Sequence, residues 1–347
     1  MLKDKGQFCF KHSAGEDIYL FTLRNANAEI SIINYGAIIT SFKVKQPGGN
    51  INDIVLGFDH PEDYLAEEYL AEYPYFGAAI GRYANRIKNG QFSIDEKFYP
   101  LAKNRGTDHL HGGRAGFDKK VWKCDHYSNN KLVLKYRSKD GEEGYPGNLD
   151  ITIRFELNNN ELLYEFFANT DAPTTVNLTH HSYFNLNNGK GEIGDHTVKV
   201  NSSYILEQDD NLVVTGKKLA VQNTPYDFRI PKRINKEWPA IGYDQTFVLD
   251  ENLPMDLSSG LSFAADAFSE KSNLKLEVYT SEPVVHFYTG KWIPVLKGKN
   301  GNQYGPFSGF CLETQKHPNA INISHFPNTI LRPGETYHTK TMYRIIT

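Results

Sequence analysis

Two adjacent histidines stand in the run NLTHHSYFNL (177–186). Side chains alternate between the two faces of an extended strand, so His181 is expected to point one way and His180 the other. An imidazole directed into a cleft can donate or accept a proton near neutral pH. Histidines that only form hydrogen bonds within a loop would give the same run. A catalytic role and a structural role therefore both stay open at this point.

A carboxylate with the features of a base occurs in GFCLETQKHPNAIN (309–322). Phe310 and Leu312 alternate there with Cys311 and Glu313, so Glu313 should lie opposite the most apolar side chains. A carboxylate that is partly desolvated has a raised pKa and can act as a general base. The structural alternative is a glutamate that ends a strand and forms a salt bridge.

A second pair of histidines lies in HLHGG (109–113), where His109 and His111 would face the same way if the segment is extended. Imidazoles at this spacing are credible metal ligands. No obvious carboxylate or cysteine is paired at ligand spacing with these two or with His180 and His181. We therefore expect neither a metal site nor a cofactor.

Two polar segments contain groups that suit the hydroxyls of a ligand. GRYANRIKNG (81–90) places Asn85 and Arg86 ahead of a turn, and a guanidinium offers a rigid fork of donors to vicinal hydroxyls or a carboxylate. GYDQTFVL (242–249) places Asp244 before a strand, where a buried carboxylate could accept two hydroxyl protons. A surface arginine and an aspartate that caps a turn are the structural alternatives.

Short alternating runs rich in β-branched and aromatic residues recur along the whole chain, and turn sequences such as PGGN, KNGQ and RPGE separate them. A βαβ alternation with glycine-rich phosphate loops is absent from the sequence, and 61–72 is the best candidate for a short helix. The pattern predicts an all-β fold, a single large antiparallel β-sandwich that forms one domain over residues 1–347. The clearest predicted strands are 28–36, 131–137, 149–157, 161–169, 273–280 and 336–346.

Composition narrows the class of partner. The 347 residues carry a formal net charge of −3 and no long basic run, so no nucleic-acid partner is expected. The first 21 residues contain no long apolar stretch, which predicts neither a leader peptide nor a membrane span. Three widely spaced cysteines (Cys9, Cys124 and Cys311) indicate no disulfide framework and fit a reducing cytoplasm.

Taken together, these segments resemble the aldose 1-epimerase (galactose mutarotase) family. The resemblance runs from about residue 75 to the C-terminus, with a weaker match in INYGAIITSF and IVLGFD before it. It implies a galactose mutarotase-like supersandwich with an open cleft on one sheet. It also implies an activity, the interconversion of the α and β anomers of free aldohexoses such as galactose and glucose. The matching runs, in the family's order, are GRYANRI, HLHGG, DGEEGYPGNL, NLTHHSYFNL, DFRIPKRI, GYDQTFVL, HFYTG, GFCLETQKHP and ILRPGETYHTKTMYRI.

The resemblance also implies roles for individual residues. His181 matches the family's catalytic acid and Glu313 its catalytic base. His111 matches a second histidine in the cleft that assists binding at the ring-oxygen side of the sugar. The residues that match those holding the sugar hydroxyls are Asn85, Arg86 and Asp244.

Three positions depart from the family's usual residues. His180 stands where the family often has Asn, and Gln245 where it has His; both are expected to face away from the site. His286 stands where the family has a Gln that contacts the sugar. A histidine can still donate or accept there, but it lacks the two-ended amide geometry. We therefore count His286 among the expected sugar-binding residues, and substrate preference depends on it.

Anomer interconversion by ring opening needs one acid and one base. Opening the hemiacetal removes a proton from the C1 hydroxyl and delivers one to the ring oxygen, and closure on the other face reverses both transfers. With ordinary pKa values of about 4.3 and 6.5, an ionised Glu313 and a protonated His181 coexist between those pH values. A neighbouring carboxylate is expected to raise the protonated fraction of His181 further. Such a pair resets itself without a cofactor.

Two alternatives differ in what they require. A hexose-6-phosphate 1-epimerase would need extra basic residues around the cleft, for which the matched segments supply Arg86 plainly and Arg82 and Arg114 less clearly. A non-catalytic sugar-binding module would have lost the acid or the base, and both are present here. The expected partner is a small neutral sugar, with no nucleic acid and no membrane, and the expected assembly is a monomer or a weak homodimer.

Overall fold

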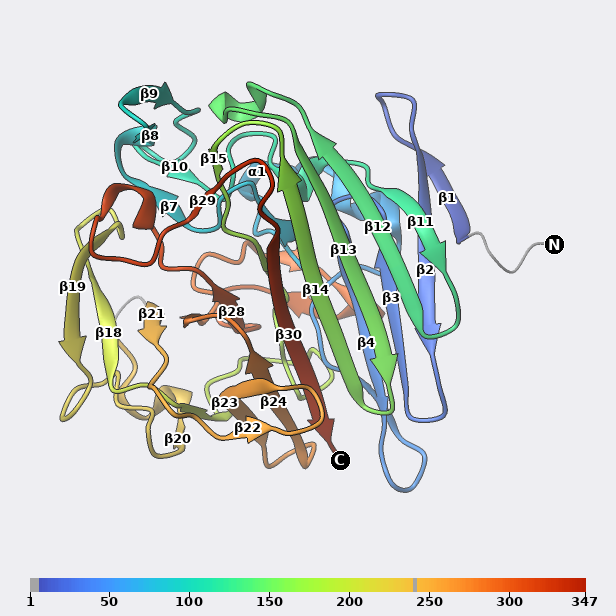
Figure 1. Cartoon of the computed structure of the whole chain (residues 1–347). Coiled ribbons are helices and arrows are strands. Elements are labelled where there is room, and N and C mark those ends of the chain that lie inside the picture. Colours follow the sequence, from blue (N-terminus) through green and yellow to red (C-terminus); the bar gives the residue numbers. More distant parts are fainter. Residues whose placement is uncertain (1–5, 240–241) are drawn as a thin grey trace.

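The computed structural model describes residues 6–239 and 242–347, so the first five residues of the segment predicted to contain no leader lie outside the described residues. The largest sheet has ten antiparallel strands (Figure 1). In its long strand β13, every second residue from Leu149 to Leu157 is buried, as the period of a half-buried strand requires. The strands of this sheet are, in order, β11 (Lys123–Tyr127), β12 (Lys131–Ser138), β13 (Leu149–Asn158), β14 (Glu161–Thr170), β30 (Tyr337–Ile346), β24 (Leu274–Thr280), β23 (Leu261–Ser269), β17 (Thr197–Val200) and β20 (Lys232–Arg233), with β22 (Met255–Asp256) beside β23.

A five-stranded meander near the N-terminus packs against one half of the large sheet, and its strands are blue in Figure 1. Phe21, Ile30 and Ile32 from the meander belong to the same buried hydrophobic cluster as Leu132 and Ile153 from the large sheet. Burial of these apolar side chains supplies the main free energy that joins the two layers. The strands of the meander are β1 (Gln7–Lys11), β2 (Asp17–Arg24), β3 (Ala28–Ile33), β4 (Ile38–Lys45) and β5 (Ile51–Asp53).

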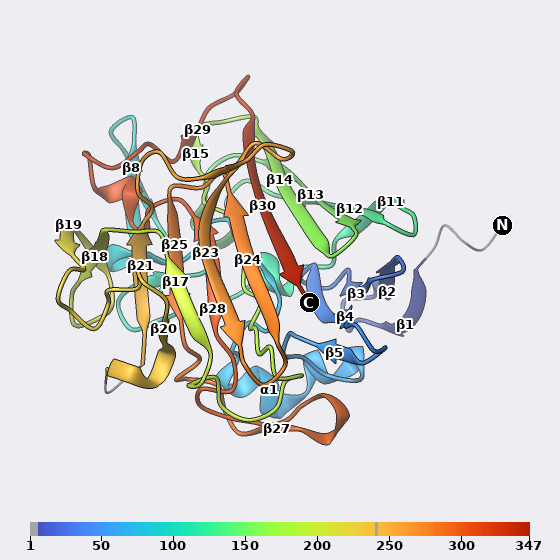
Figure 2. The same ribbon diagram turned by 90° about the horizontal axis from the view of Figure 1, so that it is seen from below.

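A third sheet packs against the other half of the large sheet (Figure 2). Phe247 and Phe287 from this sheet share the main cluster with Ala265, Ala267 and Val278 from the large one. The predicted antiparallel β-sandwich is therefore confirmed. The strands of the third sheet are, in order, β19 (Val214–Ala220), β18 (Tyr204–Gln208), β21 (Asp244–Val248), β25 (Val284–Tyr288) and β28 (Cys311–Gln315).

All six runs predicted as the clearest strands form strands, namely β3, β12, β13, β14, β24 and β30. The predicted short helix at 61–72 is confirmed as η1 (Pro61–Leu65) and α1 (Glu67–Glu72), which bury Tyr64 and Tyr69. In the described part of the chain, no helix is both long and apolar enough to cross a membrane. The remaining short elements are β6 (Ala79–Ile80), β7 (Arg86–Ile87), η2 (Lys88–Gly90), β8 (Gln91–Ile94), β9 (Lys97–Pro100), β10 (His109–Leu110), η3 (Phe117–Lys119), η4 (Glu142–Gly144), β15 (Thr174–Thr175), β16 (Thr179–His180), η5 (Ile234–Glu237), β26 (Leu296–Lys297), η6 (Lys299–Gly301), β27 (Gln303–Tyr304), η7 (Ala320–Asn322) and β29 (Ile330–Leu331).

A buried ion pair ties the N-terminal meander to η6. Lys299 Nζ lies 2.7 Å from Asp53 Oδ2 and donates to the Thr40 carbonyl at 2.9 Å. Asp53 also accepts hydrogen bonds from the Ser41 hydroxyl at 2.7 Å and the Phe42 amide at 3.0 Å. Both charged side chains are less than a tenth exposed, so each depends on the other rather than on water for compensation of its charge.

Removal of one partner of this pair should destabilise the fold strongly. We expect Asp53→Asn to leave the Lys299 ammonium buried without a counter-charge and to lower the free energy of unfolding by about 3–5 kcal/mol, measured by urea denaturation. Lys43→Ala is the control, because it removes a partly exposed pair with Glu29 and should cost less than about 1 kcal/mol. Equal losses in the two variants would contradict the special role of the buried pair.

Candidate active site

Three of the predicted site residues project from one face of the third sheet. His286 on β25 lies opposite Glu313 on β28 and opposite Thr246 on β21. Residues that are opposite each other share a face, and Asp244, two positions before Thr246, shares it as well. Gln245 alternates with them and faces the other way, as expected. That other face packs into the core with Phe247, Phe287 and Leu312.

The adjacent histidines diverge at the end of β16. The His180 ring packs in the core, with its centroid 5.9 Å from that of Phe155 and 5.6 Å from that of Tyr164. The next residue, His181, places Nε2 3.6 Å from Oε1 of Glu313. The prediction that the two histidines point to opposite sides is confirmed, and His181 is the one that meets the carboxylate.

The paired strands β7 and β10 position Asn85 and His111. The His111 backbone amide donates to the Asn85 backbone carbonyl at 3.0 Å, and the Asn85 backbone amide donates to Nδ1 of His111 at 3.3 Å. Because Nδ1 is an acceptor, the neutral ring carries its proton on Nε2 and can donate there. His111 has a φ of 51°, so the segment is not extended and His109 does not face the same way. His109 instead contacts the Ala102 carbonyl and the Tyr145 hydroxyl, each at 2.7 Å.

All seven predicted residues line one pocket of about 100 Å³. Tyr288, another lining residue, follows His286 by two positions and could have been found from the period of the strand. Tyr75 comes from the loop after α1, where no repeating pattern indicates it; its ring centroid lies 4.8 Å from that of His111 and 5.8 Å from that of His181. Other residues that line the pocket are Glu72, Tyr73, Pro74, Arg105, Leu110, Tyr183 and Trp292.

Burial dominates the electrostatics of the His181–Glu313 pair. Glu313 is 1% exposed, and loss of hydration raises the pKa of its carboxyl to about 7 although His286 acts in the opposite direction. The same loss lowers the pKa of His181 to about 3. Asp244 acts to raise the pKa of His181, as expected of a neighbouring carboxylate, but desolvation outweighs this attraction. The expected increase in the protonated fraction of His181 is therefore wrong. Between these two values the pair holds one proton, and burial places it on Glu313.

His286 is held on both sides by its neighbours in the sheet. Its Nδ1 lies 2.9 Å from the Thr246 hydroxyl and its Nε2 2.8 Å from Oδ1 of Asp244. Burial acts to raise the pKa of Asp244, but the hydrogen bond from His286 leaves that pKa below its ordinary value. A direct contact between His286 and a sugar, as expected from the sequence, would require one of these bonds to break. In this arrangement His286 orients Asp244.

Two buried atoms in the pocket lack a hydrogen-bond partner among the described residues, namely Nε of Arg86 and Oε2 of Glu313. Arg86 is only 7% exposed, and this burial lowers the pKa of its guanidinium although Asp244 opposes the shift. Buried polar atoms normally have partners. A donor and an acceptor without partners on the same pocket therefore fit a ligand with hydroxyl groups.

His181, Cys311 and Glu313 form the one cluster of metal-ligand type found in the described part of the chain, with their ligand atoms within 4.8 Å of one another. The lone cysteine on this face of β28 lies beneath the pair, with Sγ 3.4 Å from Nδ1 of His181. Nitrogen, sulfur and oxygen donors suit an ion such as Zn²⁺. An ion bound there would occupy both proton-carrying groups, so metal binding and proton transfer exclude each other at this place.

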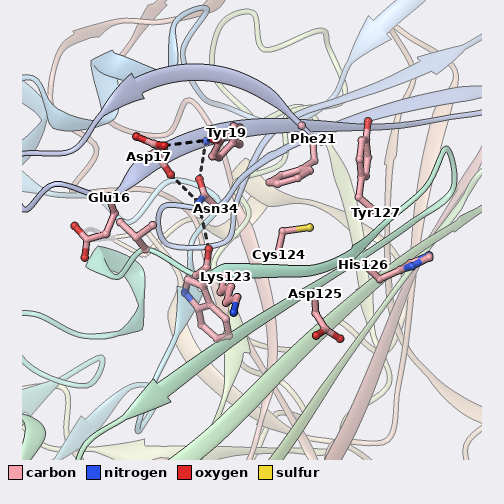
Figure 3. Close-up of a pocket in the computed structure, with 13 residues that line it drawn as sticks. Glu16, Asp17, Tyr19, Phe21, Asn34, Lys123, Cys124, Asp125, His126 and Tyr127 are labelled. Atoms are coloured by element: carbon pink, nitrogen blue, oxygen red, sulfur yellow. Dashed lines mark hydrogen bonds between the residues drawn. The ribbon is translucent and has the colours of Figure 1, made fainter. Parts of the chain in front are cut away.

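A larger hollow of about 840 Å³ lies between β2 and β11 (Figure 3). The Asn34 side chain joins its walls: Nδ2 donates to the Asp17 and Trp122 carbonyls at 3.1 and 3.2 Å, and Oδ1 accepts a hydrogen bond from the Tyr19 backbone amide at 2.8 Å. Asn34 is labelled in Figure 3 beside Asp17 and Tyr19. Burial raises the pKa of the Cys124 thiol there, which keeps it protonated. None of the seven predicted residues lines this hollow.

Arg82 and Arg114, the two less clear basic residues for a hexose-6-phosphate 1-epimerase, differ in burial and position. Arg82 is 1% exposed and donates to the carbonyls of Pro146 at 2.8 Å and Gly147 at 3.0 Å, so its role is structural. Arg114 is exposed and lines a hollow that adjoins the pocket.

The protein is a β-sandwich whose pocket contains a buried imidazole–carboxylate pair next to polar groups that can bind hydroxyls. A family model described as aldose 1-epimerase matches residues 19–344. Galactose mutarotase from Sus scrofa is 42% identical over 93% of this chain and 92% of its own length, and aldose 1-epimerase from Escherichia coli is 31% identical over 96% of each. Among solved structures, an aldose epimerase homologue from C. elegans has a TM-score of 0.86 at 29% identity, covering 95% of this chain and 99% of its own. Galactose 1-epimerase from Lactobacillus acidophilus has a TM-score of 0.80 at 27% identity over 97% of each chain. The chain belongs to the aldose 1-epimerase family.

The burial of His181 predicts an abnormal titration in the sugar-free protein. We expect its imidazole to stay neutral from pH 8 down to about pH 4, followed by NMR of the ring nitrogens, because its pKa is lowered to about 3. In the urea-unfolded chain the same ring should titrate near about 6.5. A midpoint above pH 6 in the folded protein would show that the carboxylate, not burial, controls the ring.

Proposed function

We propose that this protein is an aldose 1-epimerase, an isomerase that interconverts the α and β anomers of free aldohexoses such as galactose and glucose. The observation that carries the proposal is the buried contact of 3.6 Å between His181 and Glu313 on a pocket in which Arg86 has a donor without a partner. The relatives named galactose mutarotase and aldose 1-epimerase, matched over nearly their full length, support the same reaction.

Glu313 is the base and His181 the acid of the proposed reaction. Glu313 removes the proton of the C1 hydroxyl while His181 delivers a proton to the ring oxygen, and the C1–O5 bond breaks to give an open-chain aldehyde. Rotation about C1–C2 presents the other face of the aldehyde to the C5 hydroxyl. Closure then returns one proton to His181 and the other to O1, so both residues regain their starting forms.

The altered pKa values of Glu313 and His181 match the protonation state of the site when the sugar is the open-chain aldehyde. Ring opening leaves Glu313 protonated and His181 neutral, which is the distribution that burial prefers. The ring-closed complex requires the opposite, charged distribution in the same desolvated place. Because the neutral pair is also the resting form of the site, the closed-ring complex must first move the proton from Glu313 to His181, and this transfer is part of the barrier to ring opening. The open-chain aldehyde then holds the pair in the form that burial prefers.

The other pocket residues hold the sugar while C1 turns. Arg86 and Asn85 donate to hydroxyls, and Asp244, oriented by His286, accepts from them. His111 carries its proton on Nε2 and donates near the ring oxygen.

The common core of all three large sheets supports one domain over residues 1–347, and three free cysteines support a cytoplasmic location.

Loss of the base tests the assignment directly. We expect Glu313→Gln to fold normally, because the amide has nearly the same shape, and to lose roughly 10²- to 10⁴-fold in kcat. Polarimetry of freshly dissolved α-D-galactose and α-D-glucose measures the rate, and circular dichroism checks the fold. Glu277→Gln, on β24 and paired with Lys275, is the matched control. Near-normal catalysis by the Glu313 variant would refute the assignment.

The pH dependence of the rate is also determined by the pair. Above about pH 7 the pair loses its single proton and has no acid, and below about pH 3 it gains a second and has no base. We therefore expect kcat/KM to be level on the acid side of neutrality and to fall about tenfold per pH unit well above pH 7. Polarimetric rates corrected for the uncatalysed reaction at each pH provide the measurement. A kcat/KM that rises beyond pH 8 would contradict this assignment of the acid and the base.

A further inference from the structure

A hollow of about 480 Å³, here called the basic annex, adjoins the active-site pocket. The two spaces have five lining residues in common, so the annex lies directly beside the place where the sugar is proposed to bind. The shared residues are Glu72, Tyr73, Tyr75, Arg105 and Leu110. The lining of the annex contains one carboxylate, Glu72, and four cationic side chains, Lys103, Arg105, Arg114 and Lys119.

None of the four cationic side chains of the annex forms an ion pair within the described parts of the chain, and the Lys119 ammonium lies 4.2 Å from the centroid of the Tyr73 ring. No carboxylate oxygen there lies within 4.0 Å of any of the four cationic groups. Lys119 Nζ instead donates to the Arg114 carbonyl at 2.8 Å, and Arg114 donates to the Lys103 carbonyl at 3.3 Å. Glu143 beside them accepts the Arg114 and Ala115 amides, each at 3.0 Å. Like charges held together beside a recess create a potential that attracts an anion.

The wall of the annex is preorganised by one side chain. Asn104 donates to the Leu110 carbonyl at 2.9 Å and the Gly113 carbonyl at 3.0 Å, and it accepts the Leu110 amide at 2.8 Å. These three bonds close the loop that carries Lys103, Arg105 and Arg114. A preformed loop loses little conformational entropy when a ligand binds.

The arrangement of the acid and the base indicates which end of the sugar faces the annex. Glu313 acts at O1. Its cross-strand neighbour His286 contacts Asp244, so Asp244 lies on the O1 side of the pocket, and C2, the carbon next to C1, is placed on that side. His181 acts at the ring oxygen, and the Tyr75 and His111 rings lie beside it, with centroids 5.8 and 5.4 Å away. C5 and its substituent C6 follow the ring oxygen, so they extend toward Tyr75, which also lines the annex.

We propose that the basic annex is a subsite for an anionic group attached at C6 of the aldose, a phosphate or a carboxylate. The enzyme then accepts 6-phosphorylated aldoses or uronic acids in addition to neutral aldohexoses. This proposal rests on the proposed function, because the direction of C6 follows from the roles of His181 and Glu313. The cationic groups contact only the anionic substituent, and the proton transfers at C1 and the ring oxygen are unchanged.

The test compares mutarotation of D-glucose, D-glucose 6-phosphate and D-glucuronate, each corrected for its own uncatalysed rate in the same buffer. The variant is Lys103→Ala/Arg114→Ala, which removes two annex cations that do not line the active-site pocket. The control is Lys135→Ala/Arg137→Ala on β12, which removes the same charge from pairs with Asp125 and Asp150. The readout is kcat/KM for the anionic sugar divided by kcat/KM for glucose.

We expect the annex variant to lower this ratio about tenfold for at least one anionic sugar and the control to change it less than twofold. Added salt should lower the wild-type ratio, since exposed charges are screened. A fall for the phosphate alone assigns the subsite to phosphate, and a fall for glucuronate alone assigns it to carboxylate. Accelerated glucose mutarotation with an unchanged ratio for both anionic sugars would overturn the annex proposal only. No acceleration of glucose by the wild type would overturn the proposed function and this proposal with it.

Discussion

Desolvation of His181 and Glu313 is the constraint on which the site depends. Two groups that both need a charged form in the proposed reaction are buried 3.6 Å apart, where each charge loses its hydration. In water their ordinary pKa values would separate the charges, with the proton on the imidazole. Burial reverses that order and moves the proton to the carboxyl. The reversal matches the protonation state reached when the sugar ring opens.

The register of the third sheet maintains this arrangement. Glu313 and Leu312 are neighbours on β28, one on the pocket face and the other in the hydrophobic core. A slip of one residue between β25 and β28 would bury the carboxylate among apolar side chains and turn Leu312 into the pocket. The Phe287 and Leu312 side chains resist such a slip because they are fully packed on the core face. The core and the active site are thus two faces of the same strands.

Local alternation explains what the sequence could predict. The position of Glu313 opposite apolar neighbours, the divergence of His180 and His181, and the orientation of Gln245 away from the pocket all follow from a period of two within a few residues. The sandwich follows for the same reason, since alternating runs continue from end to end of the chain. The resemblance to a known family then brought together the seven pocket residues, which alternation alone leaves far apart in the sequence.

The features that escaped prediction depend on φ angles or on distant packing. His111 leaves the extended conformation at a positive φ, so the expected pairing with His109 fails. The contact of Cys311 with His181 joins segments 130 positions apart, and Tyr75 enters from a loop. The pKa of His181 depends on burial by the whole fold, so a value taken from a free side chain has the wrong direction.

His286 shows how one substitution can redistribute the contacts of a pocket. An amide at this position could hold a neighbour with one end and a sugar hydroxyl with the other. The imidazole has one atom for each partner, and both are engaged, by Thr246 and by Asp244. In the proposed binding mode the polar contact with the sugar therefore passes to Asp244 and Arg86, which carry opposite charges on the same pocket. Charge-assisted hydrogen bonds are shorter and stronger than neutral ones, so in the proposed binding mode Asp244 and Arg86 contribute more to hydroxyl selection than the Asn85 amide does.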